Sequence, residues 1–201
     1  MLPGEILSKL KNKYPLAKCA LNHKSVYELA VATILSAQCT DVRVNLVTPL
    51  LFEKYPTIND LANADIENVK IIIRSTGFFN TKAKNIIGFS KMVVEDYKGI
   101  VPDKMCELIK LPGVARKTAN VVLGEWYKKP EGIAVDTHVK RLSNLLGLTK
   151  HTDPVKIEQD LMKLFPKTEW VYISLALIQY GRDFCNAKRH DTSKCFLGGH
   201  G

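Results

Sequence analysis

The sequence lacks an apolar run long enough for a membrane-spanning helix. Its most apolar stretch, residues 171–178, falls far short of the roughly 20 residues that such a helix needs. The first residues lack the basic and apolar regions of a secretory signal, so we expect no such leader. Cysteine is scarce, and an odd total of five, three of them widely scattered, does not suggest a disulfide framework. These absences predict an intracellular protein.

Sustained strand alternation and low-complexity segments are also absent, whereas a helical period runs through nearly every segment. Apolar residues make up 46% of the chain and charged residues 24%, as in an ordinary globular protein. We expect about ten helices and an all-α fold. The main predicted helices cover residues 26–38, a segment capped by Asp41, 66–75, 81–97, a short segment capped by Asp103, 116–127, 137–146, 154–165 and 170–181.

Acidic residues are outnumbered by basic ones. The chain has 29 Lys and Arg against 20 Asp and Glu, which gives a net charge of +9. This excess favours a polyanionic partner, nucleic acid before a membrane surface. Charge alone fits equally well a basic protein that binds nothing acidic.

The segment 111–123 predicts a tight turn between two helices. Pro112 fixes one backbone dihedral angle, and Gly113 permits conformations that are closed to other residues. Backbone N–H groups at such a turn and at the following helix start can bind an anion, and a DNA phosphate is the obvious one. Turn chemistry alone also fits a generic connection between helices. The candidate DNA-contact residues here are Gly113, Val114, Ala115, Arg116 and Thr118.

Lys117 lies at the start of the second helix, where a phosphate-anchored strand can present a sugar to it. The helix start, the neighbouring Arg116 and partial burial favour the neutral amine that nucleophilic attack requires. Attack at C1′ expels a damaged base and leaves a Schiff base, which then permits β-elimination of the 3′ phosphate. The alternative is a surface lysine that contacts phosphate.

Asp136 follows an apolar run and immediately precedes a predicted helix, 19 residues after Lys117. Its carboxylate can stabilise a cationic sugar or move protons for Lys117. It can equally be the N-cap of the helix, and both roles are compatible. We assign His138 a supporting role, through phosphate contact, orientation of Asp136 or simple packing.

These motifs resemble the endonuclease III branch of the helix-hairpin-helix DNA glycosylases. The resemblance rests on Leu-Pro-Gly-Val-Ala-Arg-Lys-Thr-Ala-Asn-Val-Val-Leu from residue 111 and on Ala-Val-Asp-Thr-His from residue 134. Segments 34–45 and 76–86 agree as well, and the similarity extends from about residue 25 to 187. It implies a bifunctional glycosylase and abasic-site lyase that acts on oxidised pyrimidines in duplex DNA, with Lys117 as nucleophile and Asp136 as its partner.

The resemblance also assigns DNA-contact roles outside the hairpin. Gln38 matches the family residue that enters the gap left by the flipped base, and Phe78 occupies the position of an apolar wedge that is usually leucine. A larger ring there can stack on the opposite base. Ala115 replaces the usual second glycine of the hairpin, so its φ must be negative.

The implied fold has two helical domains with the active-site cleft between them. Residues 20–129 form a continuous helical domain that contains the helix-hairpin-helix at about 104–127. Residues 1–19 and 130–201 form the second domain from N-terminal and C-terminal helices. We expect a monomer in the cytoplasm or associated with the nucleoid, with double-stranded DNA as its partner.

The tail departs from the family, which usually ends in four cysteines that hold an iron–sulfur cluster. Only Cys185 matches that pattern, so we predict no cluster and no other cofactor. Zinc at Cys185, His190, Cys195 and His200 is a weaker alternative to a loose basic tail. The remaining cysteines, Cys19, Cys39 and Cys106, are expected to be small core residues in helices.

Two other functions remain open at this point. One is a monofunctional glycosylase that removes uracil or thymine opposite guanine, although such relatives typically lack the lysine. The other is a non-catalytic helix-hairpin-helix module that only binds DNA.

Overall fold

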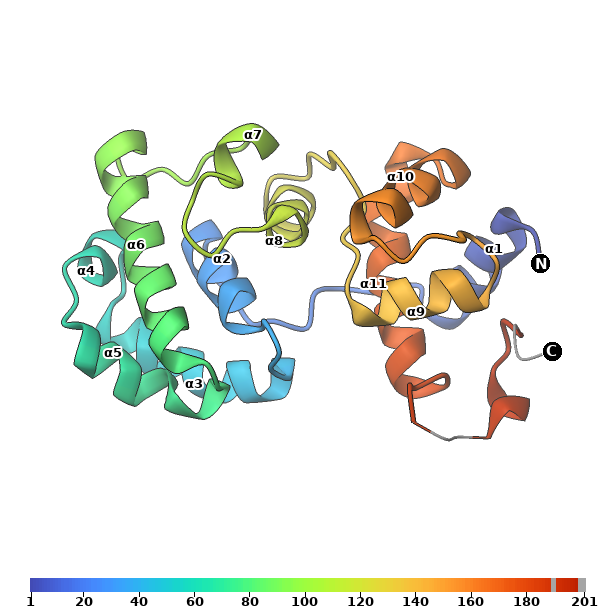
Figure 1. Ribbon diagram of the computed structural model, residues 1–201, viewed down its shortest axis with the longest axis horizontal. Helices are drawn as coiled ribbons and strands as arrows, with labels where there is room; N and C mark the ends of the chain where they lie inside the picture. The colour runs from blue at the N-terminus through green and yellow to red at the C-terminus, as the bar shows by residue number, and fades with distance from the viewer. Residues whose placement is uncertain (189–190, 199–201) are drawn as a thin grey trace. The chain divides into compact units, whose positions relative to one another are not determined.

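The computed structural model describes residues 1–188 and 191–198, and every regular element in these ranges is a helix (Figure 1). The predicted all-α class is therefore confirmed. None of these helices is both long and apolar enough to cross a membrane. The chain divides into two compact units. Residues 20–129 form one, here called the continuous unit, and residues 1–19 with 130–201 form the other, here called the split unit.

The continuous unit is organised around α6 (Phe79–Tyr97), a helix of 19 residues. α6 packs against α2, α4 and α5, and Figure 1 shows α2 on one side of it and α4 and α5 on the other. Four large side chains on these helices are completely buried: Ile86 and Phe89 on α6, and Leu29 and Leu35 on α2. The other elements of this unit are α2 (Val26–Leu35), α3 (Asp41–Lys54), α4 (Ile58–Ala62), α5 (Ile66–Ile73), η1 (Arg74–Thr76), α7 (Met105–Leu108), α8 (Arg116–Val121) and η2 (Val122–Trp126).

Two helix starts in this unit differ from the sequence prediction. Thr40, and not Asp41, is the N-cap of α3, because its hydroxyl accepts the N–H of Arg43 at 3.2 Å. Threonine and aspartate are both favoured caps, so two adjacent candidates do not fix the boundary. Asp103 does not cap α7, since its carboxylate pairs with Lys129 instead.

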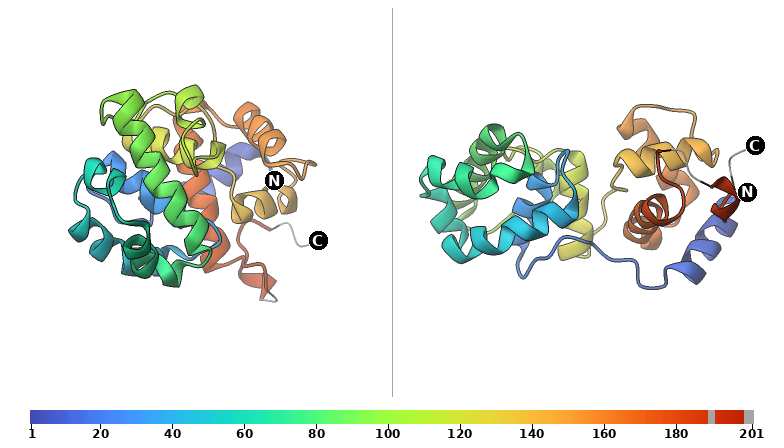
Figure 2. Two further views of the ribbon diagram at one scale, coloured as in Figure 1. Left: turned by 60° about the vertical axis from the view of Figure 1, so that its left-hand side comes forward. Right: turned by 90° about the horizontal axis from the view of Figure 1, so that it is seen from below.

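The split unit is organised around α11 (Trp170–Asp183), which packs against α1 (Pro3–Lys13) and α9 (Thr137–Leu145). Figure 2 shows the N-terminal helix beside the C-terminal helices of this unit. Ser174 Oγ donates to the carbonyl oxygen of Ala134 at 2.7 Å and so ties the segment before α9 to α11. The unit also contains α10 (Pro154–Leu164), η3 (Lys167–Glu169) and η4 (Thr192–Lys194). Its core includes Ile6, Leu10, Val139, Leu142, Ile157, Leu161, Ile173, Leu177 and Tyr180.

Three cysteines expected in the helical core lie elsewhere. Cys19 and Cys39 are half-buried in loops, and Cys106 is exposed on α7. The expectation was wrong because a small apolar residue type says little about burial when it stands next to a turn. Only Cys185 and Cys195 are buried, and both belong to the split unit.

Candidate functional site

The turn between α7 and α8 has the predicted hairpin geometry. Leu111 and Val114 are buried and anchor it, and the N–H of Val114 donates to the carbonyl oxygen of Leu111 at 3.1 Å. Gly113 has a φ of +76°, which favours glycine. A Cβ at this position would stand 2.9 Å from the Asn85 Cβ and 3.1 Å from the Ile34 Cγ2. Both the backbone angle and the available space therefore require glycine here.

Ala115 is the N-cap of α8, with a φ of −86° and extended backbone. The negative φ is the condition that an alanine at this hairpin position has to meet. No side-chain hydrogen bond caps this helix start. The first N–H groups of a helix have no intrahelical acceptor, so an uncapped start that follows an exposed turn is suited to an anion.

Lys117 is the second residue of α8 and is half-buried. The residues after it, Thr118 and Ala119, are buried, and α8 packs against α2 and α7. The helical chain then continues through the π-helical turn η2. Lys117 is thus held on a packed helix, directly beside the turn formed by Pro112 and Gly113.

Gln38 and Phe78 lie in two loops of the same continuous unit, and both side chains are exposed. Phe78 is 64% exposed, which is unusual for a phenylalanine. Their φ angles are 53° and 48°, in the left-handed region. α2 therefore ends at Leu35, before Gln38, and α6 begins directly after Phe78, two residues earlier than the sequence indicated.

Asp136 is the N-cap of α9 in the split unit, and its Oδ1 accepts the N–H of Val139 at 2.8 Å. This hydrogen bond fixes the orientation of the half-buried carboxylate. His138 packs against α11, since its Nδ1 lies 2.7 Å from where a Cβ on Gly181 would stand. Lys117 and the predicted DNA contacts other than His138 thus belong to the continuous unit, whereas Asp136 and His138 belong to the split unit.

Cys185 and Cys195 are buried in the split unit beside aromatic rings. The Arg141 guanidinium donates to the carbonyl oxygen of Cys185 and, at 3.5 Å, to its Sγ. Phe196 packs edge-on against Tyr180, with ring centroids 4.9 Å apart. His190 and His200, the other members of the zinc alternative, lie outside the described residues. Within the ranges 1–188 and 191–198, no three or more His, Cys, Asp or Glu side chains are grouped so as to hold a metal ion.

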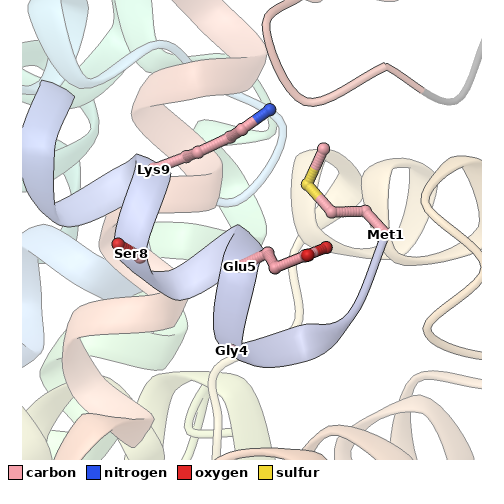
Figure 3. A pocket seen from close by; sticks show the side chains of 5 residues that line it. All are labelled: Met1, Gly4, Glu5, Ser8 and Lys9. Atoms are coloured by element: carbon pink, nitrogen blue, oxygen red, sulfur yellow. The ribbon is translucent and has the colours of Figure 1, made fainter.

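A pocket on α1 is lined by none of the predicted site residues (Figure 3). Among the residues that line it, Glu5 accepts the N–H of Leu2 at 2.9 Å, and Lys9 donates to the carbonyl oxygen of Phe196 at 3.2 Å. These side chains therefore serve the start of α1 and its contact with the tail. The lining residues are Met1, Gly4, Glu5, Ser8 and Lys9.

Sequence reasoning missed Lys82, which is buried on α6 between the two loops that carry Gln38 and Phe78. Its Nζ donates to the carbonyl oxygens of Leu35 and Thr76. A signal was present, because position 82 belongs to the same helical face as the apolar residues 86, 89 and 93. A lysine on the core face of a helix needs a buried partner, and the pattern did not reveal which one.

The chain is similar to known proteins along most of its length. Residues 31–167 match the HhH-GPD superfamily of base excision DNA repair proteins. An endonuclease III of Synechocystis sp. is 54% identical over 193 residues, which cover 96% of this chain and 88% of the relative. An endonuclease III of Bacillus subtilis is 45% identical over 192 residues, which cover 95% and 87%.

Solved structures also show a likeness to endonuclease III. The structure of a non-covalent endonuclease III–DNA complex matches with a TM-score of 0.93 and 42% identity, over 98% of this chain and 94% of that chain. A thermostable thymine-DNA glycosylase matches with a TM-score of 0.86 over 97% and 93%. At 19% identity, that second likeness shows the common fold alone.

Proposed function

The chain belongs to the endonuclease III branch of the HhH-GPD superfamily and is a base-excision-repair DNA glycosylase with abasic-site lyase activity; we propose that it removes oxidised pyrimidines from duplex DNA with Lys117 as its nucleophile. It acts as a monomer on the DNA inside the cell. The observation that carries this proposal is the position of Lys117, half-buried at the uncapped start of α8 and next to the hairpin turn.

In the proposed mechanism, the neutral Lys117 amine attacks C1′ of the damaged nucleotide. The N–C1′ bond forms as the glycosidic bond breaks, and the base leaves with the bonding electron pair and takes up a proton. Opening of the sugar ring then gives an iminium ion, which acts as an electron sink. Loss of a C2′ proton breaks the C3′–O bond, and the 3′ phosphate leaves. One lysine thus serves both base removal and strand cleavage.

Asp136 is the proposed partner of Lys117. Its carboxylate stabilises positive charge that develops on the sugar and accepts the proton that Lys117 must lose before attack. The hydrogen bond from the N–H of Val139 supports this role, because it holds the carboxylate in one orientation without neutralising it. His138 supports the same helix start by packing against Gly181.

The proposed grip on DNA combines the hairpin with two gap-filling side chains. The backbone of Gly113, Val114, Ala115 and Arg116, with Thr118, binds a phosphate and so anchors one strand. The net charge of +9 supports a polyanionic partner. A target base must leave the stack before any residue can reach its C1′, and unstacking is cheapest for damaged bases. Gln38 then fills the gap, and the Phe78 ring stacks on the opposite base.

We further propose that the chain carries no iron–sulfur cluster. Such a cluster is held by four cysteine thiolates, and the sequence places only Cys185 and Cys195 in the tail. Burial raises the pKa of the Cys195 thiol, which disfavours the thiolate that binds metal. The Cys185 Sγ already accepts a hydrogen bond from the Arg141 guanidinium. The aromatic rings beside the two cysteines pack against one another and fill the space there. These residues do not fit the cluster.

Lys117→Gln tests the nucleophile. We expect the variant to bind duplex DNA with one abasic site as wild type does, because the hairpin backbone is unchanged. Strand cleavage should fall by roughly a thousandfold or more, as in enzymes that lose their nucleophile. Binding is measured by fluorescence anisotropy and cleavage by gel electrophoresis.

The control is Lys91→Gln, which removes the same charge from an exposed position on α6. Cleavage at the wild-type rate in Lys117→Gln contradicts the mechanism. A parallel loss of binding and cleavage identifies Lys117 as a phosphate contact and not as the nucleophile.

A further inference from the structure

Lys82 is a buried cation that the proposed chemistry does not use. Its side chain lies near the start of α6 and is only 4% exposed. Nζ donates to the carbonyl oxygens of Leu35 and Thr76, both at 2.8 Å. A buried ammonium group is costly unless hydrogen-bond acceptors replace its water, and burial lowers the pKa of this lysine. Such a costly group calls for a structural reason.

The two acceptors lie just ahead of the exposed residues Gln38 and Phe78. Leu35 is the last residue of α2, three positions before Gln38, and Thr76 ends η1, two positions before Phe78. Both carbonyls are at C-terminal helix ends, where partial negative charge attracts a cation. The backbone N–H of Lys82 also donates to the carbonyl oxygen of Phe78 at 3.0 Å. One residue therefore ties both loops to α6.

The two loops hold conformations that need such a constraint. Gln38 and Phe78 adopt φ angles of 53° and 48°, which are unfavourable for residues with a Cβ. Unfavourable backbone angles persist where the surroundings over-determine them, and they cluster at functional sites. The Lys82 hydrogen bonds fix the chain two or three residues before each of these angles.

The hairpin turn packs on the following turns of the same helix. Asn85 lies against Gly113, and a Cβ on Gly88 would stand 3.3 Å from the Cγ of Pro112. Ile34, the residue before Leu35, also contacts Gly113. The N-terminal half of α6 therefore supports the hairpin and both loops, and Lys82 is the member of this support that reaches the two loops together.

We propose that Lys82 is a positioning residue that holds the Gln38 and Phe78 loops in the joint arrangement needed to enter the duplex. The inference rests on the proposed function, in which these side chains fill the gap left by the damaged base. Lys82 touches neither DNA nor the reacting atoms. Its two hydrogen bonds make insertion of one loop depend on the position of the other.

Lys82→Met tests this inference because it keeps the length of the side chain and removes the donor. The DNA probe is a duplex with the adenine analogue 2-aminopurine opposite a tetrahydrofuran abasic-site analogue. Aminopurine fluorescence rises when the base is separated from its neighbouring bases, which quench it, so it reports insertion without any chemistry. We expect wild type to raise the fluorescence and Lys82→Met, at saturating protein, to lose most of that rise. Excision of thymine glycol should fall by up to about a hundredfold, the effect of a misplacement of about an ångström.

Two further variants separate positioning from simple loss of stability. Phe89→Leu disturbs a fully buried side chain two turns along α6 and serves as a destabilised control. Its fluorescence rise should match that of wild type at a temperature where both are folded. Lys82→Arg restores donors for both carbonyls and should recover much of the signal. If Lys82→Met does not fold, Lys82→Gln, whose amide is shorter, takes its place with the same expected loss.

A double-mutant cycle provides the second readout. Phe78→Ala removes the inserted ring, so adding Lys82→Met to Phe78→Ala should lower excision by less than Lys82→Met does in wild type. Additive losses of excision in the cycle overturn the inference. So does a fluorescence rise of wild-type size in folded Lys82→Met, or a loss of that rise in Phe89→Leu as large as in Lys82→Met. If wild type itself gives no fluorescence rise, the result contradicts gap filling and thus the proposed function, whatever the role of Lys82.

Discussion

Gly113 stands at the tip of the hairpin turn with a φ of +76°, and side-chain atoms of Asn85 and Ile34 lie where its own side chain would begin. A larger residue therefore meets a backbone penalty and a steric penalty at once. Gly99 isolates the first of these, because its φ is +80° and a Cβ there would meet nothing within 4 Å beyond the adjoining chain. A comparison of substitutions at Gly113 and Gly99 therefore separates the free-energy cost of the turn conformation from that of packing against α6 and α2.

Gly113→Ala should destabilise the protein more than Gly99→Ala does. The left-handed backbone alone costs about 1–2 kcal/mol for a residue with a Cβ, and overpacking against Asn85 adds roughly 1–3 kcal/mol. Urea unfolding followed by circular dichroism measures both changes in the free energy of unfolding. Equal destabilisation in the two variants would show that the turn moves away from α6 without cost.

At the scale of elements, Tyr172 links α11 to the end of α1. Its hydroxyl donates to the carbonyl oxygen of Tyr14 at 3.1 Å, and Lys11 on α1 pairs with Glu169 at 2.6 Å. Burial, with a contribution from Glu169, raises the pKa of Tyr172 from 10.0 to about 12. This contact keeps the N-terminal helix on the C-terminal helices, although more than 150 residues separate them in the chain.

The raised pKa predicts a loss of stability at alkaline pH. Between about pH 10 and 12 the unfolded phenol of Tyr172 loses its proton while the folded one keeps it. The unfolded state then binds fewer protons, so the free energy of unfolding falls as pH rises through this window. Tyr172→Phe should flatten part of this pH dependence and cost about 1 kcal/mol at neutral pH. An unchanged alkaline slope in Tyr172→Phe, measured by urea titrations at several pH values, would contradict the assignment.

The elements also show which structural features are readable in the sequence. Local chemistry predicts the Asp136 cap, the hairpin turn and most helix bounds, because each depends on a few adjacent residues. The start of α3 is ambiguous since Thr40 and Asp41 are both good caps. Asp103 is misassigned because its partner, Lys129, is 26 residues away. Lys82 is missed for the same reason, as one of its acceptors is 47 residues distant.

At the scale of the whole molecule, the proposed chemistry draws on both units of the chain. Lys117 comes from the continuous unit, and Asp136 comes from the split unit, immediately after the chain passes from one to the other. Lys117 is the second residue of α8, and Asp136 is the N-cap of α9. In the proposed mode of binding, the hairpin and the two loops supported by α6 supply the DNA contacts. The central claim is that Lys117 forms the Schiff base from which the strand is cleaved.

Borohydride trapping on duplex DNA with one abasic site tests that claim most directly, because borohydride reduces a Schiff base to a stable covalent link. We predict a protein–DNA adduct with wild type and none with Lys117→Gln. Asp136→Asn, which keeps a side-chain oxygen for the cap of α9, should form the adduct more slowly. Specific binding by wild type without any adduct would contradict the lysine mechanism and favour a monofunctional glycosylase or a DNA-binding module.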